Sequence, residues 1–325
     1  MKIALIGTGV YGLAMALMIN KNEPNIIMWS ESQERYQKYL EDGCIKNIIP
    51  NISAPSNIKL TCSYEEATKG ADVVFIISTA TFVNAICSEI NQFITEDTVI
   101  CIASKGIENH SCRFLSDIAY QTLKTKYIAV ISGPSFAIDM VNNNPIGLSI
   151  ASKEEKAINT IKQILASDTI KLRETKDLIG IQICGSIKNV IAVASGILNG
   201  LNYPESTQCF LITEALNDIK NLITALGGNP KTINSFAGVG DLILTCTSTK
   251  SRNYSFGKFI GQGATKEEKE SYLKEHTVEG YYTLKSIYKL VQTQNIEMPI
   301  IDLIYKIIIN DEDPQELISF LINKK

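Results

Sequence analysis

Short apolar runs alternate with helix-periodic segments through the first half of the chain. The runs are rich in Ile and Val and end at polar or turn residues; they read KIALIG, NIIMWS, ADVVFIIS, TVICIASKG and YIAVISGPS, between residues 2 and 135. Continuous apolar runs of this length are typical of strands buried on both faces, as in a parallel sheet. The segments between them carry helical spacing, for example LAMALMINK at 13–21. This alternation predicts an α/β fold with a doubly wound sheet.

The pattern changes near Asp177, where long helix-periodic segments begin. They include LIGIQICGSIKNVIAVASGIL, CFLITEALNDIKNLITALGG and YYTLKSIYKLVQTQ, and the glycines of LGG at 226–228 indicate a helix end. We therefore expect two domains: residues 1–180 form a dinucleotide-binding domain, and residues 181–325 form a mainly α-helical, substrate-binding domain.

Composition narrows the class of protein. The chain has 325 residues, of which 45% are hydrophobic and 20% charged, with a net charge of -3. This balance argues against a general nucleic-acid partner, and no apolar run is long enough to predict membrane insertion. The first strand begins at Lys2, which leaves no room for a leader peptide, so we expect a cytoplasmic protein.

The cysteines and histidines argue against a metal site and against acid–base catalysis by histidine. The eight cysteines are scattered without metal-ligand spacing, and those inside apolar runs, such as Cys101 and Cys184, are expected to be reduced core thiols. We predict no metal site. With only His110 and His276 present, acid–base chemistry is expected to rest on another residue type.

A glycine motif follows the first predicted strand. GTGVYG at 7–12 places Gly7 at a tight turn, Gly9 where the backbone approaches a pyrophosphate, and Gly12 where the next helix packs closely. The helix start then offers amides and a favourable dipole to phosphate. Strand, turn and helix in this order predict a Rossmann-like dinucleotide site.

The second predicted strand ends near an acidic residue, Glu31, about 20 residues after the glycines, where a carboxylate accepts hydrogen bonds from ribose hydroxyls. A carboxylate there repels a 2′-phosphate, which favours NAD over NADP. A solvated Glu31 is the alternative interpretation. Arg35, one helical turn further on, could still meet a phosphate and keeps NADP as the alternative cofactor.

One lysine interrupts an otherwise small and apolar helix. Lys188 lies in CGSIKNVIAVASG at 184–196. An ammonium is costly to bury unless it is paired or has a chemical task. The competing interpretation is that Lys188 points to solvent with its stem over apolar neighbours.

Other polar clusters follow predicted strands or lie in helical loops. They are Lys105 in ASKGIE, Gly133 and Ser135 in SGPSFA, and the set Asp241, Thr245, Ser251, Arg252 and Asn253 in GVGDLILTCTSTKSRNYSFG. Arg presents a rigid fork suited to phosphate, and Ser and Asn add hydrogen bonds. Taken singly, Lys105 could be a surface lysine, Asp241 a helix cap and KSRN a solvated loop.

Together these stretches resemble the bacterial-type NAD(P)-dependent glycerol-3-phosphate dehydrogenases. The motifs GTGVYG, SKGIE, SGPSFA, QICGSIKNVIAVASGI, GVGDLILTCTSTKSRNYSFG, TVEGYYT and EMPI appear in family order from residue 7 to residue 300. The resemblance implies interconversion of dihydroxyacetone phosphate and sn-glycerol 3-phosphate with NAD(P)H, and a supply of glycerol phosphate for phospholipid synthesis. It also implies a homodimer.

The same resemblance assigns roles to residues. It implies that Lys188 is the general acid/base, with Lys105 and Asp241 beside it at the catalytic centre. Substrate contacts fall on Lys105, Gly133, Ser135, Asn189, Asp241, Thr245, Ser251, Arg252 and Asn253. Cofactor contacts fall on Gly7, Gly9, Val10, Tyr11, Gly12, Glu31, Lys105, Ala137, Arg252, Val278 and Glu279.

Physical chemistry supports the role of Lys188. Apolar surroundings lower the pKa of a lysine toward neutrality, so one ammonium can donate and later accept a proton. A second cation at Lys105 favours the deprotonated form of Lys188, and Asp241 balances both charges.

Several positions depart from the family pattern. Glu31 stands where the family has an arginine, which puts NADPH use in doubt. The stretch STQCFLITEA places Ser206, Gln208 and Glu214 where Asn, Arg and Arg are usual, and the last change reverses a charge. These three are not assigned to the site, although substrate affinity or subunit assembly could differ.

Two rival functions share some of these features. A dehydrogenase acting on a β-hydroxy acid or a ketopantoate-like substrate would have the glycine loop and a helical lysine, but it is not expected to contain GDLILTCTSTKSRN. A non-catalytic NAD sensor could lose Lys188 or Lys105, and both are present.

Overall fold

The computed structural model describes residues 1–34, 37, 55–109 and 111–323. The chain divides into two compact units. Unit 1 comprises Met1–Ser104 and Leu115–Leu178, and unit 2 comprises Lys105–Phe114 and Ile179–Lys325. The predicted division at 180 and 181 places 105–114 in the first domain, whereas in the structure this stretch belongs to unit 2.

Unit 1 is built on one sheet of eight strands in the order β3-β2-β1-β4-β5-β6-β7-β8. The strands are β1 (Ile3–Ile6), β2 (Ile26–Trp29), β3 (Ile58–Thr61), β4 (Val73–Ile76), β5 (Val99–Ile102), β6 (Ile128–Ser132), β7 (Ile146–Ser152) and β8 (Ile170–Thr175). The predicted doubly wound sheet is confirmed. It is not wholly parallel, because β7 pairs antiparallel with β6 and parallel with β8.

Helices cover both faces of this sheet. They are α1 (Val10–Ile19), α3 (Tyr64–Thr68), the 3₁₀ turn η1 (Ala80–Phe82), α4 (Val83–Ile90), α5 (Leu115–Thr122), α6 (Ala137–Val141) and α7 (Glu155–Ile164). The strand order reverses between β1 and β4, so right-handed crossovers place α1 and α4 on opposite faces. This reversal also opens the sheet edge where such folds bind ligands, at the carboxyl ends of the strands.

The strands of unit 1 read as continuous apolar runs because both of their faces are buried. Alternate residues, such as Ile3 and Leu5 of β1 or Val73 and Phe75 of β4, share a core with α1, α6 and α7. The intervening residues Ala4 and Val74 are also fully buried. Polar residues therefore gather where the strands end.

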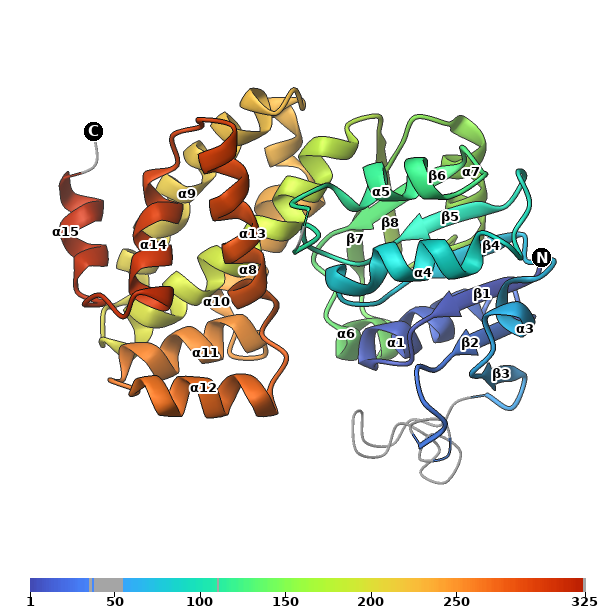
Figure 1. Ribbon diagram of the computed structural model, residues 1–325, viewed down its shortest axis with the longest axis horizontal. Coiled ribbons are helices and arrows are strands. Elements are labelled where there is room, and N and C mark those ends of the chain that lie inside the picture. The colour runs from blue at the N-terminus through green and yellow to red at the C-terminus, as the bar shows by residue number, and fades with distance from the viewer. Residues whose placement is uncertain (35–36, 38–54, 110, 324–325) are drawn as a thin grey trace. The chain divides into compact units, whose positions relative to one another are not determined.

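Unit 2 is helical, as predicted. Its elements are α8 (Leu178–Gly200), α9 (Glu205–Ala225), the 3₁₀ turn η2 (Pro230–Asn234), the π turn η3 (Phe236–Gly240), α10 (Asp241–Thr247), α11 (Arg252–Gly261), α12 (Lys266–Glu275), α13 (Glu279–Thr293), α14 (Pro299–Ile309) and α15 (Glu316–Asn323). In Figure 1 they run from yellow-green to red, after the blue and green elements of unit 1. Helix α9 ends just before Gly227, whose φ of 82° fits the predicted stop.

Helix α8 is the centre of unit 2. Its length and composition would suffice to cross a membrane, yet 94% of its most apolar stretch is buried, as in the core helix of a globular domain. Glycines let α11 approach it closely: a Cβ at Gly257 would lie 1.9 Å from the Val193 carbonyl oxygen, and one at Gly196 would lie 2.0 Å from that of Tyr254. The residues at the start of α11 are thereby held beside α8.

Candidate functional site

The glycine loop of unit 1 is shaped to admit a ligand at the start of α1. Gly7 adopts a φ of +132°, and a Cβ there would lie 2.3 Å from the Ile77 carbonyl oxygen. A Cβ at Gly12 would lie 2.3 Å from the Gly7 carbonyl oxygen, whereas one at Gly9 would meet no atom within 4 Å. Gly9 has no side chain to cap the helix, so a pyrophosphate can take that role for the first-turn amides, which begin at Val10. The loop therefore fits a dinucleotide.

Glu31 is exposed and follows the end of β2, the strand beside β1 in the sheet. The carboxylate is thus at the same sheet edge as the glycine loop, as the sequence predicts. The Trp29 ring stacks on the Tyr64 ring beside it, with centroids 4.3 Å apart. Arg35, which keeps NADP as an alternative, lies outside the described residues.

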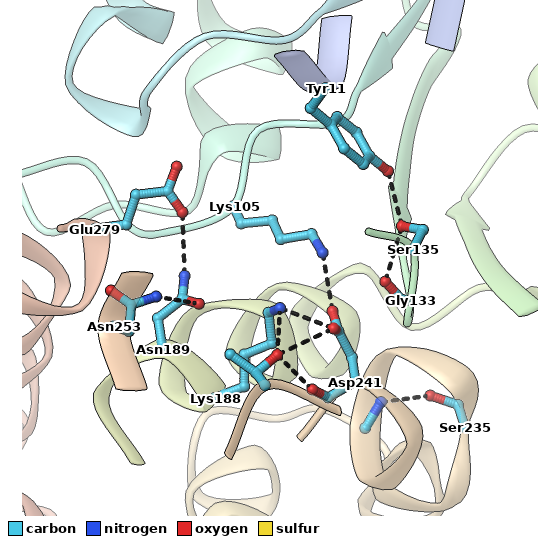
Figure 2. A network of polar contacts seen from close by, with 12 residues as sticks. Tyr11, Lys105, Gly133, Ser135, Lys188, Asn189, Ser235, Asp241, Asn253 and Glu279 are labelled. Atoms are coloured by element: carbon cyan, nitrogen blue, oxygen red, sulfur yellow. Dashed lines mark hydrogen bonds and ion pairs between the residues drawn. The ribbon is translucent and has the colours of Figure 1, made fainter. Parts of the chain in front are cut away.

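A second turn with predicted site residues follows β6. Gly133 lies against β7, because a Cβ there would be 2.5 Å from the Gly147 carbonyl oxygen. The Ser135 hydroxyl donates to the Gly133 carbonyl at 3.1 Å and lies 3.1 Å from the Tyr11 hydroxyl (Figure 2). Ala137 then begins α6. The structure thus brings Tyr11 of the glycine loop together with Ser135, although 124 residues separate them.

The catalytic candidates of unit 2 form one buried cluster. Lys188 is only 6% exposed, which excludes the solvated alternative. Its Nζ donates to Asp241 Oδ1 at 2.8 Å and to Thr245 Oγ1 at 2.9 Å. Lys105 Nζ donates to the other oxygen, Asp241 Oδ2, at 2.9 Å (Figure 2). One carboxylate therefore sits between two ammonium groups.

Local sequence explains why Asp241 and Thr245 meet Lys188. The π turn η3 ends at Gly240, and Asp241 begins α10, so Thr245 lies one helical turn later on the same face. The Thr245 hydroxyl donates to the Asp241 backbone carbonyl at 2.6 Å and thus presents its lone pairs to Lys188. Lys105 reaches the cluster because residues 105–114 belong to unit 2.

Burial and charge tune this cluster. Burial, the largest influence, lowers the pKa of Lys188 from its ordinary 10.5 to about 8; Asp241 opposes this shift, and Lys105 adds to it. Burial would raise the pKa of Asp241, but the two lysines outweigh it and hold that pKa below its ordinary value of 3.8. At neutral pH, the cluster thus holds an ionised carboxylate and an ammonium that can release its proton near physiological pH.

The side-chain amides of Asn189 on α8 and Asn253 on α11 meet beside the start of α13. Asn253 Nδ2 donates to Asn189 Oδ1 at 2.9 Å, and Asn189 Nδ2 donates to Glu279 Oε2 at 3.2 Å. Ser251 caps α11 by accepting from the Tyr254 amide. The Arg252 side chain is exposed at this helix start.

Two assignments take a different form in the structure. Val278 is fully buried in the core of unit 2, so it presents no exposed surface for the expected cofactor contact. Glu279, also expected along the cofactor, is hydrogen-bonded to Asn189.

Three residues of α9 differ from the family pattern, and one of them, Gln208, was given no role from the sequence. Gln208 is 5% exposed, and its Oε1 lies 3.3 Å from both Ser195 Oγ and Tyr254 Oη. It therefore joins α9 to α8 and α11. Its polar type at a buried helix position was the only signal. Ser206 is exposed, and Glu214 is half-buried further along the same helix.

Comparison with known proteins gives one family over nearly the whole chain. Family models described as NAD-dependent glycerol-3-phosphate dehydrogenase N-terminus and C-terminus match residues 2–158 and 177–319. Proteins named glycerol-3-phosphate dehydrogenase (NAD(P)+) are similar to it. The one from Staphylococcus haemolyticus is 32% identical, covering 99% of this chain and 98% of the relative. The one from Listeria innocua is 31% identical, covering 100% and 96%.

The fold gives the same answer. A crystal structure of glycerol-3-phosphate dehydrogenase from Coxiella burnetii matches with a TM-score of 0.93 and 29% identity, covering 99% of each chain. The chain therefore belongs to the family of NAD-dependent glycerol-3-phosphate dehydrogenases.

Proposed function

We propose that this enzyme interconverts dihydroxyacetone phosphate and sn-glycerol 3-phosphate with NAD(H), and that it supplies glycerol phosphate for phospholipid synthesis. The observation that carries the proposal is the buried cluster of Lys188, Asp241 and Lys105. Two lysines around one carboxylate can hold a carbonyl oxygen that gains negative charge and can deliver a proton to it. Family membership supports the substrate class.

The cofactor is held by unit 1. The open space above Gly9 would receive the pyrophosphate, and Glu31 would accept hydrogen bonds from the adenosine ribose. When bound, the nicotinamide supplies or takes up the hydride of the reaction.

Lys188 acts as the general acid and the general base. In the direction of reduction its ammonium donates to the oxygen at C2 of the ketone, and in the direction of oxidation its amine takes the hydroxyl proton. Asp241 and Thr245 fix the position of Nζ through the two hydrogen bonds above. Lys105 stabilises the developing oxyanion with its fixed positive charge.

The phosphate group is bound away from the reacting carbon. Arg252 is exposed at the first turn of α11, where the helix dipole also favours an anion. Its guanidinium can bind two phosphate oxygens at once, and Asn253 and Asn189 can add N–H groups. Binding energy from the phosphate then orients C2 for the transfer. The same proposal includes a homodimer, as the resemblance implies, and a cytoplasmic location, as the sequence analysis expects.

Wild-type protein is expected to oxidise NADH rapidly when dihydroxyacetone phosphate is added, and NADPH at least about tenfold more slowly. The reason is that Glu31 repels a 2′-phosphate, and like charges in contact cost several kcal/mol. Parallel assays of absorbance at the reduced nicotinamide band measure both rates.

Glu31→Gln, which keeps the size but removes the charge, is the matched control. It should reduce the ratio of the NADH rate to the NADPH rate. Equal or faster use of NADPH by the wild type would overturn the cofactor preference but keep the reaction. Binding of NADH without turnover of any ketone would instead favour a redox sensor.

The pH dependence should run in opposite directions for the two reactions. Reduction needs protonated Lys188, whose pKa is about 8, so its rate should fall about tenfold per pH unit above that value. Oxidation of glycerol 3-phosphate needs the amine, so its rate should rise about tenfold per pH unit up to about pH 8 and level off above it. Initial rates in both directions between about pH 6 and pH 10 test this. Profiles that move together would contradict the role of Lys188.

A further inference from the structure

A ring of hydrogen bonds passes through both asparagines at the proposed phosphate site. The Gly280 amide donates to Asn253 Oδ1 at 2.8 Å, and Asn253 Nδ2 donates to Asn189 Oδ1 at 2.9 Å. Asn189 Nδ2 then donates to Glu279 Oε2 at 3.2 Å. Because Glu279 and Gly280 are neighbours, the ring closes at the start of α13. Figure 2 shows Glu279, Asn189 and Asn253 in this arrangement.

The two ends of the ring define its direction. A side-chain amide can present either its oxygen or its nitrogen, whereas a carboxylate only accepts and a backbone N–H only donates. Glu279 is the acceptor end and Gly280 is the donor end, so each amide has one orientation that satisfies both of its neighbours. Asn189 and Asn253 are 3% and 7% exposed, so water offers little compensation for a mismatch.

The backbone is built to close this ring. A Cβ at Gly280 would lie 2.5 Å from the Asn189 carbonyl oxygen and 3.0 Å from Asn253 Oδ1. Any side chain at 280 would therefore push α13 away from both asparagines. The absence of a side chain at this position is what lets the amide of residue 280 reach Asn253.

A carboxylate beside a phosphate site needs a reason, because the two repel each other. Asn189 Nδ2 carries two N–H groups, and the ring uses one of them for Glu279. The second can donate to a phosphate oxygen, and so can the second N–H of Asn253. Anchoring one N–H to a carboxylate fixes the plane of the amide and therefore the direction of the other N–H.

We propose that Glu279 is a positioning residue of the substrate site, which anchors Asn189 so that the amide pair presents N–H groups to the substrate phosphate. This rests on the function proposed above. It differs from the cofactor contact that the resemblance implies for Glu279, because the carboxylate acts through Asn189 on substrate affinity.

A double-mutant cycle tests the proposal. Glu279→Ala should raise the KM for dihydroxyacetone phosphate and the Kd for sn-glycerol 3-phosphate about tenfold, the effect of losing one hydrogen bond to a charged group. The Kd for NADH should stay within about twofold of wild type. Asn189→Ala should weaken substrate binding at least as much, and adding Glu279→Ala to Asn189→Ala should cause no further loss.

Two outcomes would overturn it: an undiminished effect of Glu279→Ala in the Asn189→Ala background, or weaker NADH binding with unchanged substrate affinity. If Glu279→Ala does not fold, Glu279→Met, which has a similar size but no oxygen to accept the Asn189 hydrogen bond, goes through the same cycle with the same criterion. The wild type is assayed first, because failure to reduce dihydroxyacetone phosphate would refute the proposed function, whereas missing coupling in an active enzyme refutes only the role of Glu279.

Discussion

Replacing Lys188 with alanine is expected to lower the turnover of dihydroxyacetone phosphate about a thousandfold, the range that a general acid contributes. The affinity for NADH should not change, because Lys188 Nζ is hydrogen-bonded to Asp241 and Thr245 and is proposed to act on the substrate oxygen. Steady-state rates and fluorescence titration with NADH measure the two quantities separately.

The variant should fold, because removal of Lys188 does not leave an unpaired buried charge. Asp241 keeps its ion pair with Lys105 at 2.9 Å, and Thr245 keeps its bond to the Asp241 carbonyl. A loss of turnover in this variant would therefore come from the missing general acid and not from unfolding.

Cys184→Ala is the matched control, since Cys184 is buried one turn earlier on the same helix. It perturbs the packing of α8 without touching the ammonium and should retain turnover. Retained turnover in Lys188→Ala would refute the catalytic assignment, and loss of NADH binding would mean that the lysine supports the cofactor site.

Replacing Asp241 with asparagine is expected to lower both turnover and stability. Each lysine now donates to its own carboxylate oxygen, but an asparagine offers one acceptor oxygen and turns an N–H₂ group toward the second ammonium. Breaking a buried ion pair costs about 3 to 5 kcal/mol, so the free energy of unfolding should fall by about 3 kcal/mol near neutral pH. Chemical denaturation measures it, and turnover should drop about a hundredfold.

The stability loss should depend on pH in a defined direction. Without Asp241 the pKa of Lys188 falls below about 8 in the folded state, whereas it is 10.5 in the unfolded chain. The folded state then binds fewer protons, so its stability rises with pH between these two values. The wild type gains stability in the same way above about pH 8. The deficit of Asp241→Asn should therefore shrink as pH rises toward about 8 and stay constant above it.

Asp218→Asn provides the comparison, because Asp218 is also a buried aspartate of unit 2 but lies on α9 outside the cluster. It should retain turnover. If Asp241→Asn were as stable as the wild type at neutral pH, the two lysines would not need the carboxylate between them, and its proposed role would be wrong.

The sequence predicts the periodic elements well and the long-range pairings poorly. The strands β1, β2, β4, β5 and β6 are recognisable in the sequence as short apolar runs buried on both faces, and α8 is recognisable because its apolar spacing runs for many turns. β3 is not among the predicted runs, and its Lys59 is exposed. The direction of β7 is not readable from Ile146–Ser152, since its apolar run would suit either orientation and only its pairing with β6 decides. The register and direction of a strand depend on the neighbouring strand as well as on its own sequence.

The site shows the same limit. The residue types at Lys188, Asp241 and Thr245 indicate a charged cluster, and the i, i+4 spacing of the last two places them on one face. Burial of the Lys188 side chain depends on all the helices around α8, so its sequence alone leaves the solvated alternative open. The bond from Asn189 to Glu279 spans 90 residues and joins helices whose packing the local sequence does not encode.

Residues 105–114 belong to unit 2 although they lie within the sequence of unit 1, so the two units are not separate segments of the chain. Ile107 and Cys112 are buried in the core of unit 2, although sheet strands of unit 1 come before and after them in the chain. A nucleotide-binding unit recombined onto another partner would carry this stretch as an exposed apolar insert, and the helical unit left behind would lack Lys105. A separated unit 1 would therefore need this stretch removed, and a separated unit 2 would need it supplied.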